Sequence, residues 1–518
     1  MFKKQIKRAS VNAYKGFIKK YISHVLKNVI VLTLGLISTF SLSSANDRPN
    51  ILFCLADDWG WPHAGAYGDK VVQTPNFDKI ADQGILFHNA FISSPSCTPS
   101  RNAIVTGQQF YSLEQGANLH STLDTKYSNF MTLLKESGYK IGHFRKAWGP
   151  GEYKAGGYNE HPCGPSMEFP DFMKAKKEDQ PFCFWLGTSD PHRPYPDGYG
   201  NVPYEKVQVP GFFPDVDSVK KDIASYYYEI QRWDSDVGNA MEILKQQGEI
   251  DNTIIVMTGD HGWPFPRGKG NLYDHGARVP MAIQWKAGIQ GGRQANDFIS
   301  LTDLAPTFLE AANINIPVQM TGHSLLALLQ SGKSGRIEPQ RNFVVTGRER
   351  HTPAQEFPSM VGYPARAIRT DGWLYIINLR SLRWPAGAPY NATHPMNQFS
   401  DCDNGLTKSF IINNKDEQGY EKYYNWSFSR RPAQELYDVK KDPNQLQNLA
   451  GDDDYHQVLS SLHNKLINYL RLTGDPRFTD EFPKFSEYPY RAGYIDKNEL
   501  QEIKDKQTKN KRTQPPFK

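Results

Sequence analysis

Cysteine is scarce in this chain of 518 residues, which contains only five, and no two of them have the CxxC spacing of metal-binding or redox motifs. The sequence also lacks an internal repeat and any compositional sign of disorder. Its 39% hydrophobic and 22% charged residues are typical of a globular protein with a sizeable core. Because the length exceeds that of one small domain, we expect two domains.

A hydrophobic run long enough to cross a membrane is missing near the N-terminus, where Val29–Leu42 provides about 14 residues and a bilayer needs about 20. The basic residues before and at the start of this region, with no acidic residue among them, are Lys3, Lys4, Lys7, Arg8, Lys15, Lys19, Lys20 and Lys27. Together with Ser43-Ser44-Ala45, this arrangement predicts a signal peptide over residues 1–45, cleaved near Ala45. We therefore expect a secreted or periplasmic protein without stable membrane insertion.

An excess of positive charge disappears when this segment is removed. The whole chain has 60 basic and 55 acidic residues, and subtracting the eight basic residues of the segment leaves 52 against 55, a net charge of −3. The apparent basicity therefore belongs to the signal, and nothing in the global charge favours nucleic-acid binding.

Short apolar runs alternate with helical stretches through the first two thirds of the chain. Pro49–Ala56, Phe182–Leu186 and Thr253–Thr258 each have the continuous apolar character of a strand buried on both faces. The long stretch Val219–Gln247 between two of them is helical in pattern. This alternation predicts an α/β domain over residues 46–340, with a large, mostly parallel sheet between layers of helices.

The pattern changes near residue 340 and predicts a smaller α+β domain with an antiparallel sheet over residues 341–498. The strand-like segments separated by turns are Asn342–Thr346, Ala367–Arg369 and Trp373–Asn378. His456–Leu470 has the spacing of an amphipathic helix. The last residues, 499–518, are predicted to be a loose basic tail.

Two pairs of polar residues follow two of the predicted strands. Asp57-Asp58 ends the first strand, and Asp260-His261 ends a later one. Because parallel strands open at the same edge of a sheet, the two pairs are expected to converge. Carboxylates that close together repel unless a cation lies between them, and hard oxygen ligands favour Ca²⁺ or Mg²⁺.

The segment Cys97-Thr98-Pro99-Ser100-Arg101 carries the most specific information in the chain. It resembles the signature of the type I sulfatases, whose fold is that of the alkaline phosphatase superfamily. In that family an enzyme converts the cysteine to formylglycine (3-oxoalanine), whose hydrate attacks sulfur. The resemblance implies this role for Cys97 and a maturation enzyme as partner. Arg101, one helical turn on, matches the arginine that orients the hydrated aldehyde.

The resemblance also implies one divalent cation, usually Ca²⁺, with Mg²⁺ the lesser alternative. The positions that match its ligands are Asp57, Asp58, Cys97, Asp260 and His261. The histidine variant in Asp260-His261-Gly262-Trp263 resembles the iduronate-2-sulfatase branch. An imidazole is a softer ligand than an amide oxygen, so the three acids are the firmer part of the expected set.

Two further segments resemble the family. Pro191-His192-Arg193-Pro194 follows a strand, and the match makes His192 a sulfate contact and the general-acid candidate. Gly268–Pro280 contains Lys269, which matches the lysine that binds the sulfate and stabilises the departing oxygen. The preceding Trp263–Pro266 resembles the heparan N-sulfatase branch, which leaves O-sulfate and N-sulfate both open.

One segment, Gly138–Gly151, departs from the family pattern. Lys146 matches the sulfate-binding lysine, but the histidine expected just after it falls on Trp148 or Gly149. The family assigns that histidine as the base that releases sulfate. His143, His275 and His63 are the alternatives in this sequence.

These features predict a secreted sulfatase that hydrolyses sulfate esters of a sulfated polysaccharide or oligosaccharide. Five side chains in loops beside the motifs are candidate substrate contacts: His63, Trp148, Arg193, Arg267 and His275. Two other functions stay open. One is a phosphodiesterase or phosphonate monoester hydrolase of the same superfamily, and the other is a non-catalytic binder of sulfated glycans, suggested by the missing histidine.

Overall fold

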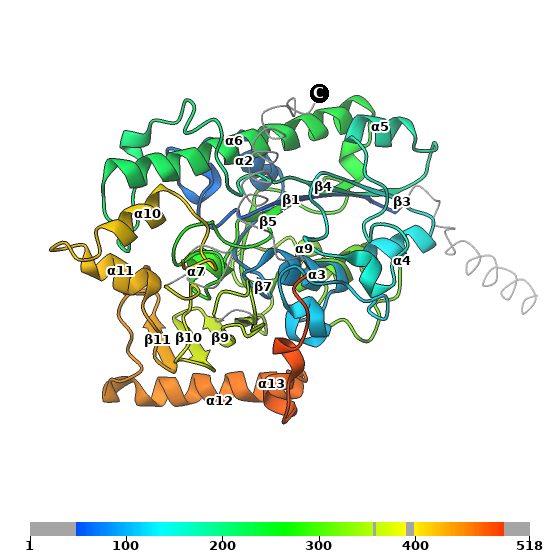
Figure 1. Ribbon diagram of the computed structural model, residues 1–518. Coiled ribbons are helices and arrows are strands. Elements are labelled where there is room, and N and C mark those ends of the chain that lie inside the picture. The colour runs from blue at the N-terminus through cyan, green and yellow to red at the C-terminus, as the bar shows by residue number, and fades with distance from the viewer. Residues whose placement is uncertain (1–47, 356–358, 390–397, 492–518) are drawn as a thin grey trace, which may run out of the picture. The chain divides into compact units, whose positions relative to one another are not determined.

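The computed structural model describes residues 48–355, 359–389 and 398–491 (Figure 1). The predicted signal peptide, residues 1–45, and the predicted tail, residues 499–518, lie outside the described residues. Within the described part of the chain, no helix combines the length and the apolar character needed to cross a membrane.

A seven-stranded sheet forms the centre of the larger part of the molecule, in the order β3-β4-β1-β5-β6-β2-β7. Its strands are β1 (Asn50–Ala56), β2 (Ile85–Phe91), β3 (Lys140–Phe144), β4 (Phe182–Gly187), β5 (Thr253–Gly259), β6 (Met281–Gln284) and β7 (Arg293–Ser300). Only β6 among them runs antiparallel to its neighbours, so the prediction of a mostly parallel sheet is confirmed.

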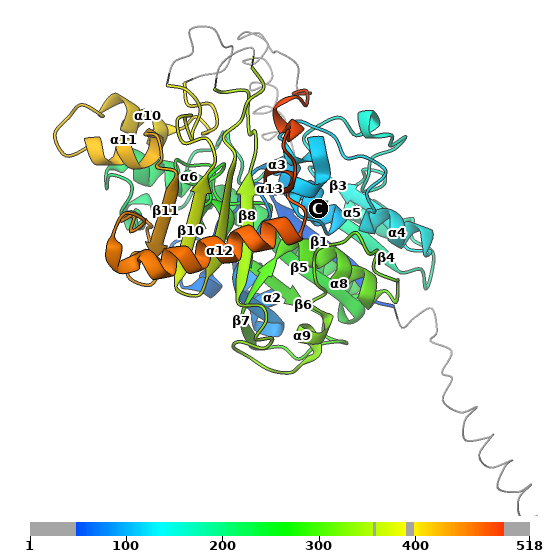
Figure 2. The ribbon, with the colours of Figure 1, turned by 90° about the horizontal axis from the view of Figure 1, so that it is seen from below.

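Helices cover both faces of this sheet (Figures 1 and 2). One core includes Ile51 and Phe53 of β1, and the helices packed on that face are α3 (Cys97–Thr106), α4 (Phe130–Glu136), α8 (Leu304–Ala311) and α9 (Leu326–Gln330). The alternate residues Leu52 and Cys54 join the opposite core, with α2 (Pro75–Gln83), α5 (Phe169–Lys174) and α6 (Asp217–Gln246). Burial on both faces explains why β1 is apolar throughout.

A second sheet has four antiparallel strands in the order β11-β10-β9-β8, as predicted for the smaller α+β region. Its strands are β8 (Phe343–Arg348), β9 (Ala365–Thr370), β10 (Trp373–Asn378) and β11 (Gln434–Asp438). The helix α12 (His456–Leu472) lies across one face, as Figure 2 shows, and buries Leu462, Leu466 and Leu470. The remaining helices are α7 (Asp274–Ala277), α10 (Leu406–Asn413), α11 (Glu421–Phe428) and α13 (Pro476–Thr479).

The two sheets share their packing. Phe110 and Tyr111 from the larger part lie in the same core cluster as Ile368 and Tyr375 of the second sheet. The described residues from Arg48 onward accordingly belong to one compact unit, and a domain boundary near residue 340 stays a prediction. All five cysteines are described, and each is buried and unpaired.

The pairing of β1 with β5 positions the polar residues that follow them. Ala56 is opposite Gly259 in the parallel register, so Asp57 and Asp260 leave the sheet side by side. The two chains approach so closely here that a Cβ on Gly259 would lie 2.2 Å from the Trp59 carbonyl oxygen. Glycine at this position therefore lets the two strand ends meet.

Candidate active site

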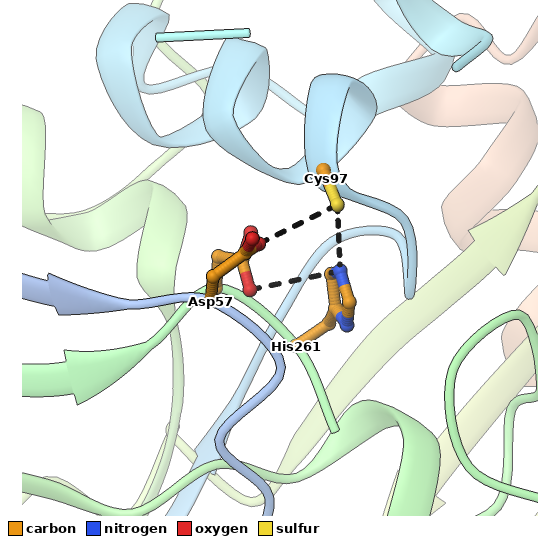
Figure 3. A group of neighbouring side chains, drawn as sticks. Asp57, Cys97 and His261 are labelled. Carbon is orange, nitrogen blue, oxygen red and sulfur yellow. Dashed lines mark hydrogen bonds and ion pairs between the residues drawn. The ribbon is translucent and has the colours of Figure 1, made fainter. Parts of the chain in front are cut away.

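Four buried side chains meet where β1 and β5 end and α3 begins (Figure 3). Asp57, Cys97, Asp260 and His261 each place one ligand atom within 4.8 Å of those of the others. The Cys97 sulfur lies 3.6 Å from Asp57 Oδ1 and 3.3 Å from His261 Nε2. The predicted convergence of the two strand-end pairs is therefore present, and the signature cysteine lies against it.

The first turn of α3 presents Cys97 to this cluster. All ten residues of the helix are buried, which fixes its orientation. Ser100 Oγ donates to the Asp260 carbonyl oxygen at 2.5 Å, so the helix is attached to the end of β5. The free N–H groups and positive dipole end of a helix favour negative charge, here at position 97.

Asp58 has the properties of a metal ligand. Its backbone has a φ of 73°, an uncommon conformation for a residue other than glycine. Its Oδ1 atom is buried and accepts no hydrogen bond from the described residues. Burial raises the pKa of Asp58, although Lys269, His192 and His261 oppose the rise. Asp58 Oδ1 has an ion-pair contact with His261 Nε2 at 3.2 Å but no hydrogen bond from the described residues, which is costly for a buried carboxylate, and a divalent cation held by the three acids would satisfy it.

His261 turns its Nε2 atom toward the carboxylates, 3.2 Å from Asp58 Oδ1 and 3.6 Å from Asp260 Oδ1. Its Nδ1 lies 3.0 Å from the Gly262 carbonyl oxygen, which can only accept, so Nδ1 carries a proton. Burial lowers the pKa of His261, but Asp260 and Asp58 outweigh it and raise the pKa to about 10. A second proton on Nε2 and a bound cation are thus alternative ways of balancing these acids.

Arg101 and Lys146 bring positive charge to the same acids. The Arg101 Nε donates to Asp260 Oδ2 at 2.8 Å, and its Nη2 lies 3.4 Å from Asp57 Oδ1. Lys146 Nζ lies 2.6 Å from both carboxylate oxygens of Asp57. Burial alone would raise the pKa of Asp57, but Lys146, His192, Arg101 and Lys269 hold it well below its ordinary value.

Lys269 and His192 lie on the other side of the acids, around Asp58. Lys269 Nζ is 3.1 Å from Asp58 Oδ2, and His192 Nε2 is 4.0 Å from the same oxygen. His192 Nδ1 lies 2.5 Å from the Arg193 carbonyl oxygen and so carries a proton, which leaves Nε2 facing the site. Lys269 also lies 3.2 Å from Asp403, a residue without a sequence motif and not expected at the site.

Of the candidate substrate contacts, His63 and Arg267 are buried and His275 is partly buried. His63 is 5% exposed, and its Nδ1 is 3.2 Å from the Tyr226 hydroxyl. His275 stacks on Trp263 with the ring centroids 5.3 Å apart. Arg267 donates to three backbone carbonyl groups of the C-terminal region. These contacts favour a structural role over contact with substrate.

Trp148 and Arg193, the other two candidate contacts, also have partners within the protein. The Trp148 indole is buried and donates to Asn102 Oδ1 at 2.5 Å, pointing into the core. Arg193 forms two parallel hydrogen bonds with Asp222, at 2.7 and 2.9 Å. Trp148 therefore fills the position of the missing histidine with a core side chain that carries no base.

His120, a histidine near the signature cysteine, is not among the candidates from the sequence. Burial, Lys146 and Lys269 together lower its pKa to about 4, so its ring is neutral at neutral pH. Its backbone N–H donates to Thr98 Oγ1, next to Cys97, and its ring meets the edge of Tyr490 at 5.0 Å. Of the three histidines considered from the sequence, His143 instead stacks on His161, His63 is buried, and the partly buried His275 packs on Trp263. No motif surrounds His120, so only the folded loop reveals it.

Comparisons with known proteins agree with this geometry. A family model described as Sulfatase matches residues 49–314. An ulvan-active sulfatase of Formosa agariphila is 29% identical, covering 84% of this chain and 82% of that protein. The human N-sulphoglucosamine sulphohydrolase is 28% identical, covering 85% of this chain and 93% of that protein.

Solved structures show the same fold. A protein in complex with its substrate D-glucosamine-2-N,6-O-disulfate has a TM-score of 0.59 at 18% identity, covering 84% of this chain and 100% of that chain. A phosphonate monoester hydrolase of Agrobacterium radiobacter has a TM-score of 0.58 at 16% identity, covering 82% and 96%. At these identities the likeness shows the fold alone, and this fold occurs both in the protein that binds the sulfated sugar and in the phosphonate hydrolase.

Proposed function

The chain belongs to the sulfatase family and is a sulfuric ester hydrolase, and on this premise we propose that it is a secreted enzyme acting on a sulfated polysaccharide or oligosaccharide through formylglycine at position 97 and a divalent cation. The observation that carries the proposal is the placement of Cys97 at the start of α3, against the carboxylates of Asp57 and Asp260. Two lysines border the acids, Lys146 at Asp57 and Lys269 at Asp58. The positive charges suit an anion, and the acids suit a cation that would bridge to it.

Formylglycine formed from Cys97 would supply a hydrated aldehyde as the nucleophile, and a bound cation, Ca²⁺ rather than Mg²⁺, would supply positive charge for the sulfate oxygens. Asp57, Asp58 and Asp260 would hold the cation, with His261 as a further ligand. Arg101 keeps Asp260 and Asp57 in place through its buried hydrogen bonds.

Lys146 and Lys269 bind the sulfate oxygens, since each ammonium group borders the carboxylate cluster. His192, when both its ring nitrogens are protonated, donates a proton from Nε2 to the leaving oxygen, because its Nδ1 is fixed on a carbonyl group and Nε2 faces the site. His120, whose backbone is bonded to Thr98 next to Cys97, is a neutral imidazole and supplies the base that the segment after Lys146 lacks.

The substrate class follows from the named relatives. An ulvan-active sulfatase and an N-sulphoglucosamine sulphohydrolase resemble this chain over most of both lengths, which supports a sulfated glycan. The basic and apolar pattern of residues 1–45 supports export by a signal peptide.

Mass analysis of the tryptic peptide Ile80–Arg101 from the native host tests the modification. We expect the mass of a chain in which the Cys97 sulfur and two hydrogens are replaced by one oxygen. Unmodified cysteine in an active preparation would contradict the proposed mechanism. Sulfate release from a panel of sulfated oligosaccharides, with an aryl phosphate diester in parallel, tests the reaction, and preference for the diester would favour the phosphodiesterase alternative.

A further inference from the structure

Asp403 reaches the candidate active site from a part of the chain that no motif marks. It precedes α10, and its Oδ2 lies 3.2 Å from Lys269 Nζ, the ammonium group that also contacts Asp58. One oxygen of Asp403, one of Asp58 and a ring nitrogen of His192 lie within 4.8 Å of one another. Asp403 is 24% and His192 32% exposed, whereas Asp58 is fully buried, so Asp403 and His192 form the open side of this group.

The loop that carries Asp403 is held rigidly from both sides. Asp401 pairs with Arg348 at 2.8 Å. Lys408 is buried and donates to the carbonyl oxygens of Phe399 and Cys402, at 2.9 and 2.7 Å. The carboxylate is therefore fixed before any substrate arrives, as a recognition group requires.

The charge of Asp403 limits what it can contact. Burial opposes its ionisation, but Lys269, His192 and His351 lower the pKa of Asp403 below its ordinary value, so the group is a carboxylate at neutral pH. A carboxylate only accepts hydrogen bonds and repels a sulfate. Lys269 lies between Asp403 and Asp58 and pairs with both.

We propose that Asp403 determines specificity by accepting a hydrogen bond from a donor next to the cleaved sulfate, a hydroxyl or an ammonium group on the neighbouring carbon of the sugar. This inference rests on the proposed function, in which Lys269 and His192 serve the leaving oxygen. A carboxylate within 4.8 Å of the His192 nitrogen reaches the substituents beside that oxygen. The same negative charge rejects sugars that carry a second sulfate or a carboxylate there.

Kinetics on matched substrates distinguish two roles of Asp403, recognition of the sugar and positioning of Lys269. The substrates are an aryl sulfate, a methyl glycoside monosulfate with a neighbouring hydroxyl, its amino and deoxy analogues, and the vicinal disulfate. We expect the native enzyme to prefer the hydroxyl or amino compound over the deoxy compound by roughly tenfold to a hundredfold in kcat/KM. Asp403→Ala should abolish that preference, because kcat/KM falls more on the hydroxyl or amino compound than on the deoxy compound or the aryl sulfate.

The two donors give different results with Asp403→Asn. An amide oxygen still accepts from a hydroxyl, so a hydroxyl preference would be partly retained, whereas an ammonium preference requires the charge and would be lost. Activity on the vicinal disulfate should rise in both variants. Asp371→Asn, which removes an exposed carboxylate paired with Lys440, is the matched control and should leave the ratios of kcat/KM between the substrates unchanged.

Two outcomes would overturn the inference. One is an unchanged hydroxyl-to-deoxy ratio in Asp403→Ala, and the other is an equal fall on every substrate including the aryl sulfate, which is the signature of positioning alone. Calorimetric binding of the same glycosides to Cys97→Ser gives a readout without turnover. If no substrate is cleaved, the proposed function fails, while the dependence of binding on Asp403 still decides this inference.

Discussion

His63 and His275 offer a test that distinguishes a structural role from contact with substrate. Both rings pack on Trp263, with Tyr226 against His63 and Phe212 against His275. His63 is buried and His275 is partly buried. Burial is the main cause that lowers the pKa of each to about 3, from an ordinary 6.5. The Nδ1 atom of His275 has no hydrogen-bond partner among the described residues, so no neighbour stabilises a proton there.

The sign of the effect follows from proton binding. A histidine whose pKa falls on folding binds fewer protons in the native state than in the unfolded state. Its contribution to the free energy of unfolding is therefore complete above pH 6.5 and is lost as the pH falls toward 3. With pKa values of about 3 and 6.5, acidification from pH 7.5 to pH 5 lowers the free energy of unfolding by about 2 kcal/mol per histidine, or about 4 kcal/mol for the pair.

Urea unfolding of the wild type and of the His63→Gln, His275→Gln double variant measures this directly. The variant is less stable than the wild type at pH 7.5 because it loses packing, but the difference in free energy of unfolding between the two should narrow by about 4 kcal/mol at pH 5. The exposed His456→Gln serves as control and should leave the pH dependence of the free energy of unfolding unchanged. A difference that is the same at pH 7.5 and pH 5 would refute the burial argument. If the variant also had a raised KM, these residues would again be candidate substrate contacts.

Three further predictions concern the site and its support. His120→Gln should lower kcat with little change in KM, because it removes the neutral imidazole proposed as the base, whereas His456→Gln should change neither parameter. A rise in KM as large as the fall in kcat would argue against a role of His120 in proton transfer. Chelation should lower both activity and melting temperature, with Ca²⁺ restoring both better than Mg²⁺, because the three carboxylates repel without a cation; retention of both after chelation would exclude the metal site. Gly259→Ala should destabilise the protein by several kcal/mol, since its Cβ would lie 2.2 Å from the Trp59 carbonyl oxygen, and Gly372→Ala, with open space around it, should be nearly neutral in denaturant unfolding.

The central sheet could be predicted because its determinants are local. Continuous apolar strands such as β1 and β5 indicate burial on both faces, and the acids directly after them then share one sheet edge. This is why the convergence of Asp57 and Asp260 is readable from the chain. The same reasoning failed to identify the environment of His63, whose neighbours Tyr226 and Trp263 are about 160 and 200 residues away in the sequence.

By itself the sequence predicted Cys97 as the nucleophile position and the acids as cation ligands, since each lies at a strand or helix end with a recognisable motif. Only the tertiary structure decided that Trp148 is a core residue, that the His120 backbone is bonded to Thr98 beside Cys97, and that Asp403 completes the surroundings of Lys269. These contacts join loops from different elements, and the position of such a loop depends on the packing of the whole chain. A side chain without a local pattern acquires its role from that packing alone.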